Sequence, residues 1–154
     1  MPGYGVLPAD RGSGLLPWAW AEERLAAAHD YWLATVWPDG RPHVMPVWGL
    51  WLDRSLWFSS SLGSRKTRNL LADPRCVVTT DQARQPVVVE GQARLVTDRD
   101  KLAEVLAAEN AKYSTAYGPE LLDPDVNACF QIVPRWVFAL ADDDFTGSPT
   151  KWVF

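Results

Sequence analysis

The sequence predicts a mainly β protein, a β-barrel with flanking helices, and three observations support this prediction. Short runs of apolar, β-branched and aromatic residues recur along most of the chain, and turn residues such as Pro-Asp-Gly separate them. Several runs are apolar on both faces, so one face needs a barrel interior and the other a helix or a second subunit. Residues 97–112 have the apolar spacing of a helix. The length of 154 residues favours a single domain of this kind.

The N-terminal part of the chain is predicted to contain an arm and a first helix. Residues 1–16 are rich in Gly, Pro and isolated charges, so we expect a flexible arm before a barrel domain over 17–154. The stretch PWAWAEERLAAAHD favours a helix from Pro17 to near Asp30. Proline stands at the first helical position, acids follow in the first turn, and apolar residues recur at spacings of three and four.

Six or seven strands are predicted after this helix. The first three form a meander of YWLATVW (31–37), PHVMPVWGLWL (42–52) and LWFSSS (56–61). RCVVTTD (75–81) and PVVVEGQARLVT (86–97) have the length and β-branched content of a hairpin, and NACFQIV (127–133) and RWVFALA (135–141) are predicted as two strands around Pro134. A helix is predicted over 97–112, between these two pairs of strands. Thr97 can cap its N-terminus, with Asp100 at the third position after the cap.

Composition excludes several classes of protein. A net charge of −4 gives no general basic face for nucleic acid or for an anionic membrane, and no apolar run approaches the roughly 20 residues of a membrane span. The N-terminus lacks the pattern of a secretory signal, so we expect the cytoplasm. Cys76 and Cys129 lie in strand-like runs without partners at metal spacing. We expect two buried free thiols and no metal site.

The clearest candidate site is SSSLGSRKTRNLLADP, residues 59–74. It predicts the end of a strand, a glycine turn and a short helix whose first turn carries Arg65, Lys66 and Arg68. The amino end of a helix carries partial positive charge, so each cation there costs about 0.3–1 kcal/mol unless an anion lies opposite. With Ser64 as cap, the free N–H groups of Arg65, Lys66 and Thr67 would point at one anion.

The side chains of this segment favour the same interpretation. Ser59, Ser60 and Ser61 offer hydroxyls at the end of the strand. Arg65 and Arg68 share one face of the predicted helix, and Lys66 and Asn69 share the neighbouring face, so they could converge on a phosphate. The alternative is a solvated basic helix that only balances nearby acids.

The order YWLATVWPDGRPHVMPVWGLWL, LWFSSSLGSRKTRNLLADPRCVV and PVVVEGQARLV resembles the pyridoxamine 5'-phosphate oxidase-like flavin- and deazaflavin-dependent oxidoreductases with a split β-barrel. The resemblance covers residues 17–97 and continues more weakly to the end of the chain. It implies a homodimer in which two subunits build each site. It also implies that the stretch GSRKTRNL holds the phosphate of a flavin or deazaflavin coenzyme.

The resemblance also implies roles for individual residues. Arg65 and Lys66 match the phosphate-binding basic pair, and Ser60 matches a hydroxyl contact to the same phosphate. Residues 46–48 fall on the strand whose backbone runs beside the ring. The tail SPTKWVF resembles the branch that uses the deazaflavin coenzyme F-420, with Lys151 where arginine is commoner, although Trp152 could instead anchor the tail in the core. The expected coenzyme contacts are therefore Pro46, Val47, Trp48, Ser59, Ser60, Ser61, Arg65, Lys66, Asn69, Lys151 and Trp152.

By this resemblance we expect an oxidoreductase that binds a reduced deazaflavin coenzyme and transfers a hydride to a small electron-poor organic substrate. FMN is the alternative coenzyme, although Pro86 replaces a glutamine of the pyridoxamine phosphate oxidases. A coenzyme carrier without turnover and a nucleic-acid module remain open. Haem-binding relatives of this barrel exist, but His43 is a lone strand histidine, expected to be a hydrogen-bonded barrel residue. No catalytic acid or base stands out.

Overall fold

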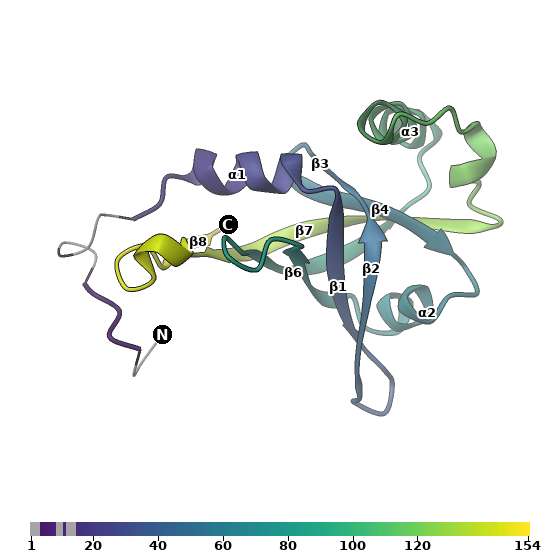
Figure 1. The fold of residues 1–154 in the computed structure, drawn as a ribbon. Helices are drawn as coiled ribbons and strands as arrows, with labels where there is room; N and C mark the ends of the chain where they lie inside the picture. Colours follow the sequence, from purple (N-terminus) through teal and green to yellow (C-terminus); the bar gives the residue numbers. More distant parts are fainter. Residues whose placement is uncertain (1–3, 9–10, 12–14) are drawn as a thin grey trace.

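One antiparallel sheet curls into a half-barrel, and three helices flank it (Figure 1). The computed structural model describes residues 4–8, 11 and 15–154. Within this part, the strands are β1 (Asp30–Val36), β2 (Pro42–Trp48), β3 (Leu50–Leu52), β4 (Ser55–Ser61), β5 (Arg75–Thr80), β6 (Val87–Val96), β7 (Asn127–Ala139) and β8 (Thr150–Val153). The helices are α1 (Trp18–Ala27), α2 (Arg65–Ala72) and α3 (Arg99–Tyr113), with 3-10 turns at Pro119–Leu122 and Asp142–Asp144. The predicted mainly β barrel with flanking helices is confirmed.

The strand order is β2-β1-β5-β6-β7-β4-β3, and β8 pairs with β7. Strands β2 and β3 therefore form the two edges of the main path. The β1–β2 hairpin is in continuous register from Asp30 opposite Trp48 to Val36 opposite Pro42. Because side chains alternate between faces, one face of β1 looks into the barrel and the other looks outward.

Two sequence predictions about the strands were wrong. The run 42–52 is divided at Gly49 into β2 and β3. Conversely, the two runs around Pro134 form one continuous strand, β7, and Pro134 lies within it opposite Gly91. The register shifts at this point, between Glu90 and Gly91, which is where a residue without a backbone N–H fits in a ladder. The chains also approach closely there, since a Cβ on Gly91 would lie 2.4 Å from the carbonyl oxygen of Val133.

The helix termini also differ from the predictions. Helix α1 starts at Trp18, so Pro17 is its N-cap, and the first turn holds no acid. It ends at Ala27 because Asp30 already begins β1. Helix α3 is capped by Asp98, whose Oδ1 accepts a 2.9 Å hydrogen bond from the Lys101 N–H, and not by Thr97. The Asp98 carboxylate thus replaces the predicted Thr97 hydroxyl as acceptor.

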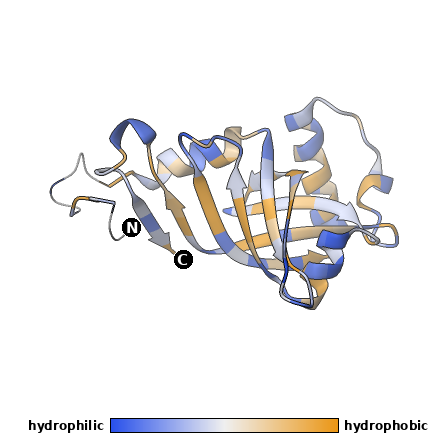
Figure 2. Cartoon of the chain, turned by 60° about the horizontal axis from the view of Figure 1, so that its bottom comes forward, coloured by the Kyte–Doolittle hydropathy of each residue, from blue (hydrophilic) through white to orange (hydrophobic). Residues whose placement is uncertain are grey.

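The buried apolar residues form three clusters. Figure 2 shows that much of the hydrophobic sequence lies in the strands. The first cluster fills the barrel interior, the second lies under α1, and the third lies under α3. Members of the first include Tyr31, Leu33, Leu56, Phe58, Val78, Phe130 and Ile132. Cys76 and Cys129 are both buried free thiols, as predicted. Of the helices in the described part, none is both long and apolar enough to cross a membrane.

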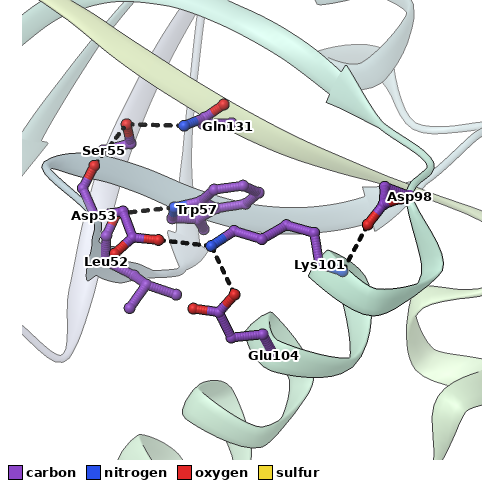
Figure 3. A network of polar contacts seen from close by, with 8 residues as sticks. All are labelled: Leu52, Asp53, Ser55, Trp57, Asp98, Lys101, Glu104 and Gln131. Carbon is purple, nitrogen blue, oxygen red and sulfur yellow. Dashed lines mark hydrogen bonds and ion pairs between the residues drawn. The ribbon is translucent and has the colours of Figure 1, made fainter.

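Helix α3 is fastened to the β3–β4 turn by a polar network (Figure 3). The Lys101 ammonium donates to Asp53 Oδ2 at 2.6 Å and to Glu104 Oε2 at 2.8 Å. Asp53 and Arg54 form this two-residue turn with φ values of 51° and 56°, as the tight hairpin requires. The network fixes the helix that carries Glu109 and Tyr113 over the sheet.

The predicted N-terminal arm lies partly outside the described residues. Among those described, the Leu7 N–H donates to the Thr146 carbonyl at 2.8 Å, and the Leu16 N–H donates to Thr150 Oγ1 at 2.9 Å. These contacts join the start of the chain to its C-terminal segment.

Candidate functional site

The start of α2 has the geometry of an anion site. Ser64 is the N-cap, as predicted, and its Oγ accepts a 3.2 Å hydrogen bond from the Thr67 N–H. The Thr67 N–H is therefore not free, which corrects the sequence prediction. The Arg68 N–H bonds to the Ser64 carbonyl. Within the described part of the chain, the N–H groups of Arg65 and Lys66 have no acceptor, so two adjacent donors remain at this turn.

The cations of this turn are not neutralised by the chain. Among the described residues, Arg65, Lys66 and Arg68 take part in no ion pair. Asp73, the C-cap of α2, is bound to the Arg75 guanidinium at 2.6 Å, and hydrogen bonds from Arg75 lower the pKa of its carboxyl to about 2. The alternative interpretation is a solvated basic helix that balances nearby acids. Among the described residues, no acid forms an ion pair with the cations of this helix, so the structure does not favour that alternative.

The three serines at the end of β4 have different environments. Ser60 Oγ donates to Ser64 Oγ at 2.9 Å, and Ser64 Oγ donates to Thr67 Oγ1 at 3.0 Å, so Ser60 belongs to the hydroxyl chain of the cap. Ser61 Oγ accepts from the Gly63 N–H at 3.2 Å and shapes the turn. Ser59 pairs with Cys129, which packs in the cluster under α3, so its side chain lies on the other face of β4 from Ser60.

Helix α2 packs against the tip of the β1–β2 hairpin. The Arg65 guanidinium lies over the Trp37 ring, 3.8 Å from its centre. One helical turn later, Asn69 is completely buried, and its Nδ2 donates to Thr35 Oγ1 at 3.0 Å, while its Oδ1 has no partner. His43 Nδ1 lies 3.3 Å from the same Thr35 oxygen, consistent with its predicted place as a hydrogen-bonded barrel residue. Trp37 is not recognisable as a site residue from the sequence, because its contact with Arg65 joins residues far apart in the chain.

The strand expected beside a coenzyme ring, β2, is an edge strand. Val47 is buried in the barrel interior, whereas Pro46 and Trp48 point to the other face and are exposed. The Trp48 indole is stacked on the Tyr113 ring, with centroids 4.4 Å apart and planes 6° from parallel. Backbone groups on one side of β2 pair with β1, and those on the other side have no strand partner in the described part of the chain.

A second polar cluster, which sequence analysis missed, lies where β2 and β3 meet α3. The Lys112 ammonium donates to Tyr31 Oη at 3.0 Å and to the Gly49 carbonyl at 2.7 Å. Tyr113 Oη donates to the His29 carbonyl at 2.6 Å and accepts from the Gly49 N–H at 2.8 Å. Burial lowers the pKa of Lys112 to about 8. These contacts span more than 60 residues, so no local pattern signals them.

Lys151 and Trp152 lie in β8, far from α2 in the same chain. Figure 1 shows β8 near the N-terminal end of the molecule and α2 at the opposite end. The Trp152 indole packs edge-on against Trp18 at 5.4 Å, and Lys151 Nζ lies 4.7 Å from the centre of the Trp136 ring. The structure therefore does not bring these two residues and the basic turn together within one chain.

Comparison with known families identifies the chain. Residues 20–141 match the family model described as pyridoxamine 5'-phosphate oxidase. This chain belongs to the pyridoxamine 5'-phosphate oxidase family. The family resemblance and the split β-barrel predicted from it are confirmed.

Three solved structures similar to this pyridoxamine 5'-phosphate oxidase family member share its fold at 23–24% sequence identity. A conserved hypothetical protein from Mycobacterium tuberculosis is 24% identical, with 84% of this chain and 87% of that chain covered and a TM-score of 0.71. An F-420 reductase is 24% identical over 75% of this chain and 94% of that chain, with a TM-score of 0.62. A haem-binding protein from Mycobacterium smegmatis is 23% identical over 90% of this chain and 59% of that chain, with a TM-score of 0.65. No protein of curated function matches the sequence.

Proposed function

We propose that this protein binds a reduced deazaflavin coenzyme of the F-420 type between two copies of the chain and uses it to reduce a small, electron-poor organic molecule. The observation that carries the proposal is the basic turn. There, two unpaired backbone N–H groups and the side chains of Arg65 and Lys66 lie together, and no acid among the described residues compensates them. Such a donor set fits a phosphate.

In this proposal Arg65 and Lys66 hold the phosphate of the coenzyme, and Ser60 supports the turn through its bond to Ser64. A hydrogen bond to a charged group contributes about 1.5–3 kcal/mol. Asn69 acts indirectly, because its buried amide holds α2 on β1 through Thr35. Ser61 shapes the turn through its bond to the Gly63 N–H, whereas the Ser59 side chain lies on the other face of β4 from Ser60.

The open edge of β2 is the proposed place for the ring. Its residues Pro46, Val47 and Trp48 lie towards the α3 end of the strand, whereas the hairpin tip lies beside Arg65. A strand rises about 3.3 Å per residue, so the five steps from His43 to Trp48 span about 17 Å. An extended coenzyme with a phosphate at one end and a ring at the other can lie along such an edge.

A homodimer is proposed because one outer face is apolar and uncovered. Trp32 lies opposite Pro46, and Ala34 lies opposite Val44, on the outward face of the β1–β2 hairpin. Trp32 is 46% exposed and Val44 is 51% exposed. A contiguous apolar face of this kind needs a partner. A second copy would also be required for Lys151 and Trp152 to reach the basic turn, since they lie far from it in one chain.

The coenzyme, when bound, would supply the hydride. The residues of the chain would bind its phosphate, orient its ring along β2 and shape an apolar cleft for the organic substrate. No side chain of the described residues is assigned as an acid or base, so the chain contributes binding and orientation. We further propose that the protein acts in the cytoplasm.

FMN is the second candidate coenzyme, because the matching family is described as pyridoxamine 5'-phosphate oxidase. FMN carries a phosphate that the same turn would hold, so the turn alone does not separate the two coenzymes. The tail with Lys151 and Trp152 and the likeness to an F-420 reductase support the deazaflavin. A carrier that binds without turnover is the remaining alternative.

Parallel titrations of the coenzyme-free protein with F-420 and FMN, followed by tryptophan fluorescence, test the proposal. We expect F-420 to bind more tightly, and Arg65→Ala with Lys66→Ala to weaken it by at least about 10²-fold while far-UV circular dichroism is unchanged. The matched control is Arg99→Ala with Arg135→Ala, which removes two exposed cations from α3 and β7.

Unchanged binding in the Arg65→Ala, Lys66→Ala variant would refute the phosphate site. Tight FMN without F-420 binding would overturn the coenzyme, and binding without consumption of reduced coenzyme on a panel of quinones and nitroaromatics would identify a carrier.

A further inference from the structure

We propose that Trp37 is a positioning residue for the coenzyme phosphate, because its indole holds the Arg65 guanidinium in place. The tip of the β1–β2 hairpin would then help to determine affinity, in addition to α2. This inference rests on the proposed function and assigns a role to a residue outside the basic turn.

The contact between the two side chains is close. The guanidinium carbon of half-buried Arg65 lies 3.8 Å from the centre of the Trp37 ring, within the range of a strong cation–π contact. Among the described residues, Arg65 has no acid partner that could hold it elsewhere. A guanidinium that stacks through its face leaves its in-plane N–H groups at the edge, where they remain able to donate to a phosphate.

The backbone that carries the Trp37 ring is itself held in place. The Trp37 N–H donates to the Arg41 carbonyl at 2.9 Å, and the Trp37 carbonyl accepts from Gly40 at 2.9 Å. Gly40 adopts φ 86°, which this tight hairpin tip requires. The Arg41 guanidinium also lies over the Trp37 ring, at 4.5 Å, but it is bound to Asp39 at 2.8 Å. Of the two guanidinium groups on this indole, only that of Arg65 lacks a carboxylate partner.

The register of α2 on the hairpin fixes the same arrangement. Arg65 and Asn69 are one helical turn apart, and they contact Trp37 and Thr35, which are neighbours on one face of β1 and its extension. The buried Asn69–Thr35 hydrogen bond therefore sets the position of the helix, and the indole sets the rotamer of the arginine. An arginine ordered before binding loses less side-chain entropy when the phosphate arrives.

The test compares Trp37→Leu and Trp37→Phe with a matched control. Trp20→Leu removes an equivalent pair on α1, where the Arg24 guanidinium lies 3.5 Å from the Trp20 ring centre, away from the basic turn. Affinity is measured with whichever of F-420 or FMN binds the unmodified protein. We expect Trp37→Leu to weaken binding about 3- to 30-fold, Trp37→Phe to weaken it less, and Trp20→Leu to leave it unchanged.

A double-mutant cycle separates positioning from a general structural role. In the Arg65→Ala background, Trp37→Leu should weaken binding by no more than about twofold, because its effect passes through Arg65. An equal loss in both backgrounds would overturn the inference. A second readout, the ¹⁵N order parameter of Arg65 Nε in the coenzyme-free protein, should fall in Trp37→Leu and stay high in Trp20→Leu. If Trp37→Leu fails to fold, Trp37→Phe in the same cycle and relaxation experiment decides.

Failure of this inference and failure of the proposed function give different results. If Arg65→Ala with Lys66→Ala leaves coenzyme affinity unchanged, the phosphate site itself is refuted. If that variant loses affinity but Trp37→Leu binds normally and the Arg65 order parameter is unaltered, only the role of Trp37 is refuted.

Discussion

The side-chain amide of Asn69 donates a 3.0 Å hydrogen bond to Thr35 Oγ1, and this bond joins the basic helix α2 to strand β1. Asn69 was expected to contact the coenzyme, but its side chain is completely buried. The buried Oδ1 of the same amide accepts no hydrogen bond from any donor among the described residues. The polar pair therefore fixes the position of α2 at the cost of one unsatisfied oxygen.

Removal of only one partner should destabilise the fold more than removal of both. Thr35→Val leaves the Asn69 amide buried without an acceptor, so we expect a loss of about 1–3 kcal/mol in the free energy of unfolding. The double variant Thr35→Val with Asn69→Leu replaces both polar groups with apolar ones of similar shape, so it should lose less than the single variant. Urea unfolding followed by circular dichroism measures both. A double variant that is the less stable of the two would contradict the assignment.

Glu109 should make stability depend on pH. It is buried on α3, it has no hydrogen bond or ion pair among the described residues, and burial raises the pKa of its carboxyl. The folded state therefore binds a proton more tightly than the unfolded state, whose glutamate pKa is about 4.3. Below the unfolded pKa the Glu109 carboxyl is neutral in both states, and its contribution to the free energy of unfolding is fully present. As pH rises from there through the folded pKa, this contribution is lost.

The variant Glu109→Gln isolates this effect. We expect it to unfold at higher urea concentration than the unmodified protein at pH 7, and at a similar concentration near pH 4, because both side chains are then neutral. Glu104→Gln on α3 is a poor control, since Glu104 bonds to Lys101, so Glu120→Gln is preferred, because Glu120 is exposed and has no ion pair among the described residues. Equal stability of Glu109→Gln and the unmodified protein at pH 7 would show that the carboxyl is not penalised by burial.

Lys112 should titrate apart from the other three lysines of the chain. Burial lowers its pKa to about 8, whereas an ordinary lysine has a pKa of about 10.4. Protein labelled with ¹³C at lysine Cε should show one of four resonances moving near pH 8, and Lys112→Arg should remove that resonance. Above the unfolded pKa the Lys112 amine is neutral in both states, so its contribution to the free energy of unfolding is fully present. As pH falls from there through the lowered folded pKa, this contribution is lost, because the unfolded state takes up the proton more readily. Four resonances that all titrate above pH 10 would contradict the burial.

The outward face of the β1–β2 hairpin should hold the proposed dimer together. Trp32→Arg with Val44→Arg places two cations on this exposed apolar face, so we expect a monomer by light scattering after size-exclusion chromatography. Val126→Arg is the control, because Val126 is also exposed and apolar but lies before β7, away from the hairpin. A dimer that survives the double change would place the interface elsewhere.

Local patterns in the sequence determined the alternation of strands, the glycine turn with Ser64 as the cap of α2, and the buried thiols Cys76 and Cys129. These features depend on neighbouring residues, and propensity, capping and burial act over a few positions. The concentration of cations at Arg65 and Lys66 was also visible in the sequence, because it conflicts with the polarity of a helix N-terminus.

Tertiary structure alone decided which partners those residues have. The continuity of β7 through Pro134 depends on the bulge opposite Gly91 in another strand, the burial of Asn69 depends on Thr35, and the lowered pKa of Lys112 depends on its enclosure near Tyr31 and Gly49. The place of Arg65 over Trp37 is of the same kind. Such contacts join residues that are far apart along the chain, and their geometry exists only after the sheet has curled and the helices have packed on it.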